Sequence, residues 1–359
     1  MKKMKFIALA FLAVLQLGAS EKYFVVERES SSLAVLQDSK VEAKIQDMND
    51  MNHGVVKFYQ DDGYAITRDG YVIKFDTKKY NVIKKYKTSK SAIGFIVESD
   101  YVAVANYDDK SVDILDRDLN PLQKIGTNSR NVGIKSYKDY LIFSEMDNDS
   151  IMVLKKNPSK EPFFMLEQEF KNVGVMPFDA MIDGKNYIAG FFKSDFFGVV
   201  DLESMKFNQI KITADNKERV LKVPHFGFWG ISKQNIFVPA VGDKKVMVYT
   251  NDFKFVKNIE MIGLPVFALL SPDQKYLAVT FSGEHFVDVQ IVDTKTLEII
   301  KNFKFDGKVL HARWSEEKPN LLISVNDTSK VAVINTQTWE LSKEIFNVQK
   351  PSGIFLLKE

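Results

Sequence analysis

The sequence predicts an all-β chain folded as a β-propeller of eight blades. A short β-branched strand with a polar end recurs along the chain, turn residues separate it from neighbouring strands, and no segment after residue 20 has a helical period. The copies end 38 to 48 residues apart, a spacing typical of four-stranded blades. Seven blades is the alternative, because the copies ending at Leu154 and Tyr249 are degenerate.

The recurring strand is found eight times in chain order. Its copies are residues 33–38, 71–76, 111–116, 150–154, 198–201, 245–249, 289–293 and 330–335. Another strand precedes each copy and a third follows it, with Asp, Gly, Asn and Lys in the turns between them. Alternating β-branched and aromatic residues between such turns are the pattern of antiparallel sheets.

The two ends of the chain have the pattern of one shared blade. Residues 351–357 resemble an innermost strand that nothing follows, whereas residues 23–26 and 33–37 resemble a blade without its innermost strand. Pairing them completes a blade and removes an exposed sheet edge. We therefore expect a single domain over residues 21–359, closed by its N- and C-terminal strands.

Residues 1–20 have the three parts of a secretory signal peptide. Lys2, Lys3 and Lys5 precede an apolar run over residues 6–17 and small residues at 18–20. The apolar run is short for a membrane span, although an uncleaved N-terminal anchor is the alternative. The pattern predicts export.

Composition argues against several classes of function. Removing the three leader lysines changes 49 basic and 47 acidic residues to 46 and 47, so charge gives no case for nucleic acid. The absence of cysteine excludes disulfides, thiolate metal sites, thiol nucleophiles and a lipid-modified cysteine. No phosphate loop, dinucleotide fingerprint or zinc spacing is present.

Three of the four histidines stand directly before predicted innermost strands. They are His53, His225 and His311. Innermost strands begin at one mouth of the central channel, where these side chains should gather as a ligand site. Each could instead be an ordinary hydrogen-bonded structural residue, and for His285 we expect a solvated loop position.

Two arginines repeat at one blade period. Arg28 and Arg68 are 40 residues apart, so they should be neighbours at the mouth, either binding carboxylates or tying down turns. Asn106 and Tyr107 occupy the matching place in the third blade, and Asp179 begins another inner strand as a candidate acid or base. A histidine for a metal and two arginines for carboxylates suit a haem-like ligand.

Ten short strings stay in order over nearly the whole chain after residue 20. They are VVER (25–28), TRDG (67–70), VANY (104–107), MPFD (176–179), YIAG (187–190), PH with WG (224–230), VPAVG (238–242), PVF (265–267), VLH (309–311) and PSGIF (351–355). These strings resemble the NirF family of periplasmic haem d1 biosynthesis proteins. They are more distantly similar to the d1-binding propeller of cytochrome cd1 nitrite reductase.

The resemblance implies a periplasmic d1-type propeller whose ligand is haem d1 or a dihydro-haem d1 precursor. It implies that His53 is the axial ligand of the haem iron and that Arg28 and Arg68 face the carboxylates of the macrocycle. Asn106 and His311 complete the expected cofactor-binding set.

On the open face, His225 falls at a distal histidine position of the reductase, and we take His225 and Asp179 as candidates for proton handling. The second distal histidine has no counterpart in residues 261–265, and no haem c domain is present, which argues against nitrite reduction.

The implied role is a late step of haem d1 assembly. The expected partners are the tetrapyrrole, cytochrome cd1 nitrite reductase and other haem d1 assembly proteins, and a homodimer is left open. A dehydrogenase-like reaction and simple holding with hand-over are both left open. A non-catalytic scaffold that binds a protein partner is the alternative.

Overall fold

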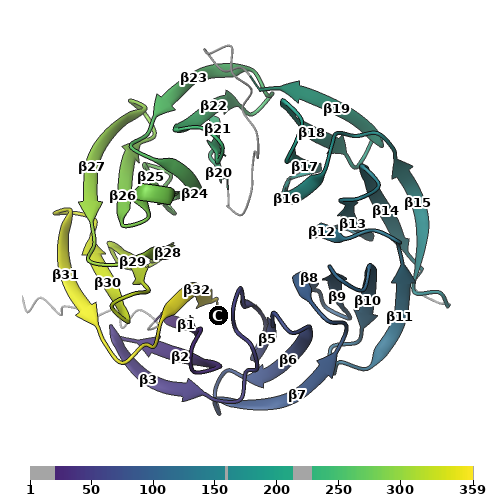
Figure 1. The fold of residues 1–359 in the computed structure, drawn as a ribbon, viewed down its shortest axis with the longest axis horizontal. Helices are drawn as coiled ribbons and strands as arrows, with labels where there is room; N and C mark the ends of the chain where they lie inside the picture. The colour runs from purple at the N-terminus through teal and green to yellow at the C-terminus, as the bar shows by residue number, and fades with distance from the viewer. Residues whose placement is uncertain (1–20, 158–160, 213–228, 359) are drawn as a thin grey trace, which may run out of the picture.

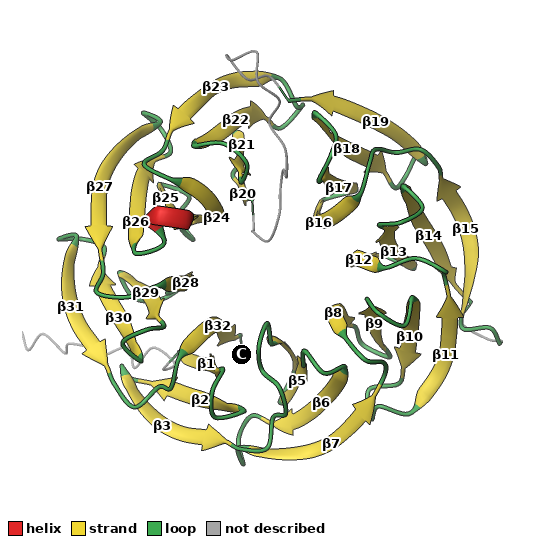
Figure 2. Ribbon diagram, in the orientation of Figure 1, coloured by secondary structure: helices red, strands yellow, loops and turns green. Residues whose placement is uncertain are grey.

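Eight four-stranded antiparallel sheets stand as blades around a central axis (Figure 1). The computed structural model describes residues 21–157, 161–212 and 229–358; the predicted signal peptide lies outside them. Apart from the short 3-10 helix η1, Gly283–His285, the regular elements described are strands (Figure 2). The eight-bladed prediction is therefore confirmed. Over these described ranges, no helix has the length and apolar character needed to cross a membrane.

Blades are numbered along the chain, and their strands run from the innermost to the outermost. Blade 1 consists of β32 (Pro351–Leu357), β1 (Lys22–Glu27), β2 (Ser32–Gln37) and β3 (Lys40–Ile45), and blade 2 of β4 (Val55–Tyr59), β5 (Asp62–Ile66), β6 (Tyr71–Asp76) and β7 (Asn81–Lys87). Blade 3 consists of β8 (Ala92–Val97), β9 (Val102–Asn106), β10 (Ser111–Leu115) and β11 (Pro121–Gly126), and blade 4 of β12 (Asn131–Tyr137), β13 (Tyr140–Glu145), β14 (Ser150–Lys156) and β15 (Phe164–Phe170). Blade 5 consists of β16 (Pro177–Asp183), β17 (Asn186–Phe191), β18 (Phe196–Asp201) and β19 (Lys206–Lys211), and blade 6 of β20 (Gly230–Ile231), β21 (Asn235–Ala240), β22 (Lys245–Thr250) and β23 (Phe255–Glu260). Blade 7 consists of β24 (Leu264–Leu270), β25 (Tyr276–Ser282), β26 (Asp288–Asp293) and β27 (Glu298–Lys304), and blade 8 of β28 (Val309–Trp314), β29 (Asn320–Val325), β30 (Lys330–Asn335) and β31 (Glu340–Ile345).

The recurring strand of the sequence is the third strand of each blade. Strand β10 is buried at every residue, because neighbouring blades cover both faces of the sheet. The outermost strand β27 is mostly exposed and correspondingly polar. Burial therefore explains why the third strands gave the clearest repeat.

The polar end of that strand caps the turn to the outermost strand. Asp76 Oδ1 accepts the backbone N–H groups of Lys78 and Lys79, both at 2.8 Å. Such Asx turns satisfy donors that the sheet leaves unpaired. Comparable caps are made by Asp116, Asp201, Asp293 and Asn335.

Hydrophobic side chains fill the eight spaces between adjacent blades. The cluster between blades 1 and 2, for example, contains Phe24, Phe75 and Val56. Eight such clusters connect each blade to the next around the ring. Because the core is distributed between blades, the innermost strands are left to line the axis.

The ring closes where β1 pairs with β32, with Phe24 opposite Phe355 and Val25 opposite Ile354. Glu27 is fully buried at this junction. Its carboxylate accepts the Gln349 backbone N–H at 2.7 Å and pairs with Lys44 at 2.7 Å. Blade 1 therefore joins the two ends of the described chain.

Candidate functional site

A repeated backbone hydrogen bond defines one mouth of the central channel. In five blades, the residue directly after the second strand donates its N–H to the carbonyl directly before the innermost strand, at 2.8 to 3.4 Å. In blade 2 the matching bond runs from the Arg68 N–H, two residues after β5, to the Asp50 carbonyl, five residues before β4. These bonds place one side chain per blade in an equivalent position, which we call the mouth ring. Its members are Arg28, Arg68, Tyr107, Met146, Phe192 and Asn326.

The mouth ring is divided by chemistry. Blades 1 and 2 contribute arginines, whereas blades 3 to 5 contribute apolar or aromatic side chains. The latter belong to a ninth hydrophobic cluster, separate from the eight between blades, which we call the apolar arc. It consists of Ile93, Tyr107, Val132, Met146, Met176, Phe178 and Phe192.

Sequence reasoning did not find the apolar arc as a unit. The one-blade period could have revealed it, because the spacing that relates Arg28 to Arg68 continues to Tyr107 and Met146. The arc borders the cationic sector at Arg68, so an amphipathic ligand would meet both.

His53 lies with the two arginines, as predicted. The loss of solvent inside the concave mouth lowers the pKa of His53 below its ordinary value, although the side chain is exposed by area; the charges of Arg28 and Arg68 lower the pKa further, and Asp50 opposes them. A neutral imidazole offers the nitrogen lone pair that a metal ion requires. The environment therefore favours the form of His53 that can act as an axial ligand.

The loop that carries His53 is tied to the neighbouring mouth-ring residue. The Arg68 N–H donates to the Asp50 carbonyl at 2.8 Å, and Asp50 Oδ1 accepts the Asn52 N–H at 2.9 Å. His53 itself has a φ of 64°, in the left-handed region. These bonds couple the position of the imidazole to that of Arg68.

Neither Arg28 nor Arg68 has a side-chain hydrogen bond or ion pair to any residue that the structure describes. Burial lowers the pKa of Arg28, and the charge of Asp50 opposes this effect. Guanidinium groups without a protein partner are available to carboxylates of a ligand. Both guanidiniums lie close enough to His53 for their charges to lower its pKa; their binding of ligand carboxylates stays a prediction.

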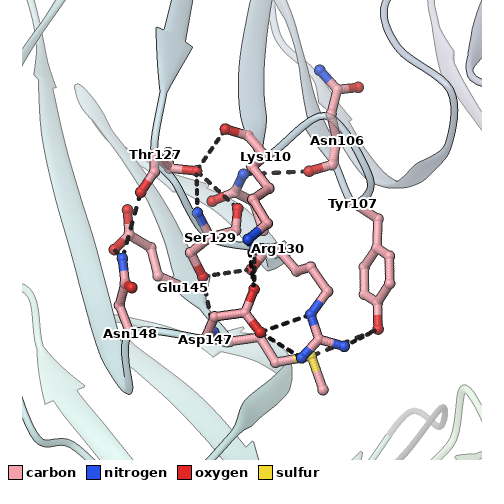
Figure 3. A network of polar contacts seen from close by, with 11 residues as sticks. Asn106, Tyr107, Lys110, Thr127, Ser129, Arg130, Glu145, Asp147 and Asn148 are labelled. Atoms are coloured by element: carbon pink, nitrogen blue, oxygen red, sulfur yellow. Dashed lines mark hydrogen bonds and ion pairs between the residues drawn. The ribbon is translucent and has the colours of Figure 1, made fainter.

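Arg130 shows the contrasting arrangement (Figure 3). Its Nε donates to Asp147 Oδ1 at 2.8 Å, and its NH1 group donates to the Tyr107 hydroxyl at 2.9 Å. This guanidinium is therefore committed within the protein and fixes the Tyr107 ring at the edge of the apolar arc.

Asn106 is placed differently from the predicted cofactor-binding position. Its side chain is fully buried and donates to Ser111 Oγ at 3.0 Å and to Asp113. The residue equivalent to Arg68 is Tyr107, one position later. Asn106 supports the blade beneath the mouth and does not present its amide to it.

His311 lies inside β28, two residues after the strand begins, and not before the strand as expected. Its ring packs against Phe267 and Phe355, with centroids 5.4 and 5.9 Å away, and Nδ1 accepts the Ile354 N–H at 3.3 Å. Burial lowers the pKa of His311 to about 3. The structure therefore gives this imidazole protein partners on three sides.

Asp179 occupies the comparable level of blade 5, at the register shift of β16. Burial raises the pKa of its carboxyl group, and the opposing effects come from Lys135 and from the Ala180 N–H, which donates to Oδ1 at 2.8 Å. A carboxyl group with a raised pKa suits proton transfer, and the proton-handling role of Asp179 stays a prediction. His225, the other predicted catalytic residue, lies outside the described residues.

The described residues thus bring together His53, Arg28 and Arg68 beside an apolar arc. Within those ranges, no group of three or more His, Asp or Glu side chains could hold a bare metal ion. A single imidazole with two free guanidiniums instead suits a metal that arrives in an amphipathic, carboxylate-bearing macrocycle.

Comparisons with known proteins agree over nearly the full chain. The family model described as Cytochrome D1 heme domain matches residues 17–359. Protein NirF of Stutzerimonas stutzeri is 29% identical over 362 residues, covering 94% of this chain and 92% of the relative. Protein NirF of Pseudomonas aeruginosa is 29% identical over 366 residues, covering 94% and 91%.

Solved structures share the fold. Dihydro-heme d1 dehydrogenase NirN in complex with DHE has a TM-score of 0.80 at 19% identity, covering 93% of this chain and 74% of that one. AztD of Citrobacter koseri has a TM-score of 0.72 at 12% identity, covering 94% and 98%.

Proposed function

The chain belongs to the Cytochrome D1 heme domain family, and from this we propose that it binds a d1-type haem, or its dihydro precursor, at the mouth of the propeller channel during haem d1 assembly. One observation carries the proposal. His53, whose lowered pKa favours the neutral imidazole, lies with two unpaired arginines beside the apolar arc. The sequence similarity to NirF proteins over nearly their full length supports assembly as the role.

Each part of a d1-type macrocycle has a counterpart among the described residues. His53 would supply a nitrogen ligand for the iron, and Arg28 and Arg68 would bind carboxylates with their planar donor groups. Tyr107 and Phe192, the partly exposed mouth-ring members of the apolar arc, would cover part of the apolar ring surface. When bound, the group supplies a redox-active iron; the residues named here hold and orient it and keep water from part of it.

Asp179 would hold a proton one level below the mouth. Its raised pKa means that a larger fraction stays protonated than for an ordinary aspartic acid. In a modification reaction it would return or accept a proton at the ligand, whereas in simple delivery it would only reduce charge beneath the ligand. The leader pattern of residues 1–20 supports the periplasm as the compartment for either role.

The test is a spectrophotometric titration of the purified protein with haem d1. We expect saturable binding with a band shift from imidazole ligation in the wild type, and at least about tenfold weaker binding without that shift in His53→Ala, a loss of about 1.4 kcal/mol. Free imidazole should restore the band shift in His53→Ala. His285→Ala is the matched control and should titrate like the wild type, because Asp288 already holds His285 at 3.0 Å.

An unchanged titration of His53→Ala would show that His53 is not the axial ligand. A wild-type protein that binds no d1-type haem under any condition would reject the proposal as a whole and favour a scaffold that binds a protein partner.

A further inference from the structure

Three cations lie at one depth inside the channel, well below the mouth. Lys57, Lys135 and Arg313 on innermost strands pair with Tyr64, Ile142 and Leu322 respectively. Each of these partners stands four residues before the mouth-ring residue of its blade. The side chains therefore belong to the same level of blades 2, 4 and 8.

A hollow of about 330 Å³ adjoins this level at the far ends of the innermost strands. It extends over four consecutive blades, since its lining comes from β28, β32, β4 and β8 and from residues that directly follow two of these strands. Strand β32 contacts β28 and β4, and β4 contacts β8; β28, β32 and β8 can be followed around the axis in Figure 1. The lining residues are Val56, Lys57, Phe58, Gln60, Val97, Arg313, Phe355, Leu356 and Lys358.

The lining contains three cations and no carboxylate. Arg313 and Lys358 share one acid outside the lining, Glu316, at 3.6 and 2.8 Å. Lys57 has no ion pair or hydrogen bond with its side chain in the described part of the chain; its Nζ lies 5.6 Å from the centre of the Phe95 ring. The hollow thus has an excess of positive charge.

The environment of Lys57 makes this excess costly. Burial and the charge of Lys135 together lower the pKa of Lys57 to about 8, against an opposing effect of Glu98. A cation removed from water without a partner is destabilising. An anion that enters the hollow would supply the missing partner.

We propose that this hollow binds a small organic carboxylate, with the carboxylate against Lys57 and Arg313 and its carbon body against the apolar lining. Five of the lining side chains are hydrocarbon: Val56, Phe58, Val97, Phe355 and Leu356. A bare inorganic anion would leave these hydrocarbon surfaces in contact with water, and a cation would find no carboxylate in the lining. The site lies at the opposite end of the innermost strands from His53 and does not depend on the function proposed for the mouth.

The test uses benzoate as the probe and benzamide as its neutral counterpart, measured by calorimetric titration. The Arg28→Met/Arg68→Met variant of the full chain is the background, so that the mouth arginines do not bind the probe. We expect benzoate to bind in this background at least about tenfold more tightly than benzamide, which is about 1.4 kcal/mol. Adding Lys57→Met should remove that preference, while Lys57→Arg should keep most of it.

Lys257→Met is the matched control, because Lys257 is exposed on the outermost strand β23. It should leave benzoate binding unchanged. Thermal unfolding by circular dichroism should show that Lys57→Met is folded, since the substitution removes an unpaired buried cation. The proposal is overturned if benzoate does not bind, if benzamide binds equally well, or if Lys57→Met weakens benzoate no more than Lys257→Met does.

Discussion

Arg28 and Arg68 differ from Arg130 although all three lie at the mouth. Arg130 is held by Asp147 and Tyr107, whereas the other two guanidiniums have no side-chain partner among the described residues. An arginine that serves the fold is normally paired when it is partly buried. Arg28 is half-buried and unpaired, so an external anion best explains its state, whereas Arg68 is exposed and free to join the same anion.

Replacing either free arginine should weaken ligand binding. We expect Arg28→Met and Arg68→Met each to reduce the affinity for a d1-type haem about tenfold, or about 1.4 kcal/mol, because each removes a charge-assisted contact to a carboxylate. Arg130→Met should change the affinity little. Spectrophotometric titration of the three variants checks this, and equal effects at all three positions would mean that only the net charge of the mouth matters.

His311 shows how burial changes the pH at which a histidine binds a proton. The pKa of His311 is lowered to about 3 in the folded protein, whereas in the unfolded chain it has its ordinary value of about 6.5. As the pH falls, His311 is therefore protonated in the unfolded chain at a higher pH than in the folded protein. Its neutral state therefore favours folding above about pH 6.5, and this contribution is lost as the pH falls from about 6.5 towards 3.

The stability of His311→Gln should depend less on pH than that of the wild type. Between pH 7 and pH 5 we expect the wild type to lose about 2 kcal/mol more of its free energy of unfolding than the variant, on the basis of about 1.36 kcal/mol per pH unit below 6.5. Glutamine can still accept the Ile354 N–H. Urea unfolding at the two pH values measures the difference, and parallel losses in both proteins would show that His311 does not titrate in this window.

At the scale of the element, the loop before β4 positions His53. The Gly54 N–H donates to the Met51 carbonyl at 2.9 Å, and a Cβ at Gly54 would lie 2.7 Å from Met51 Cε and 3.1 Å from the Met51 carbonyl oxygen. Met51 is fully buried. A side chain at residue 54 would displace the end of the buried Met51 side chain and press on its carbonyl oxygen, so close approach favours glycine in this loop.

Gly54→Ala should therefore impair the site more than the fold. We expect a loss of about 1–3 kcal/mol in the free energy of unfolding from overpacking, together with weaker haem titration because the loop carrying His53 moves. Gly126→Ala is the control, since its Cβ would meet nothing within 4 Å. Normal haem affinity in Gly54→Ala would show that the imidazole tolerates displacement of its loop.

The strands themselves are the elements most directly encoded. Third strands are largely buried on both faces, so their residues are mostly apolar, and an Asp or Asn at the end caps the next turn. Both constraints are local, which is why the repeat was visible in the sequence. Innermost strands carry register shifts near the mouth, and these made the position of His311 harder to predict.

At the scale of the whole molecule, the ring is held by its closing blade. Strand β32 comes from the C-terminal end of the chain, yet it supplies the innermost strand beside β1. Ile354 is fully buried between blades 1 and 8 and Leu356 nearly so. Without β32, β1 would expose an unpaired edge and both adjacent blades would lose apolar contacts.

Deleting residues 351–359 should therefore destabilise the entire ring. The loss of two buried aliphatic side chains alone costs about 1.5–3 kcal/mol each, and the open edge should promote aggregation. Deleting only residues 358–359, which follow the strand, is the control. Thermal unfolding and light scattering compare the two, and equal melting temperatures would show that closure contributes little to stability.

The sequence by itself determined the propeller, favoured eight blades over seven and singled out the candidate residues His53, Arg28 and Arg68, because these follow from a local repeat and its period. The tertiary structure settled the count at eight. Only the tertiary structure decided which neighbours complete the site. The apolar arc joins side chains from three blades, Arg130 is neutralised by Asp147, and Asn106 and His311 are engaged within the protein. These outcomes depend on contacts between residues distant in the chain, and a one-dimensional period predicts equivalent positions without specifying which side chains will find partners there.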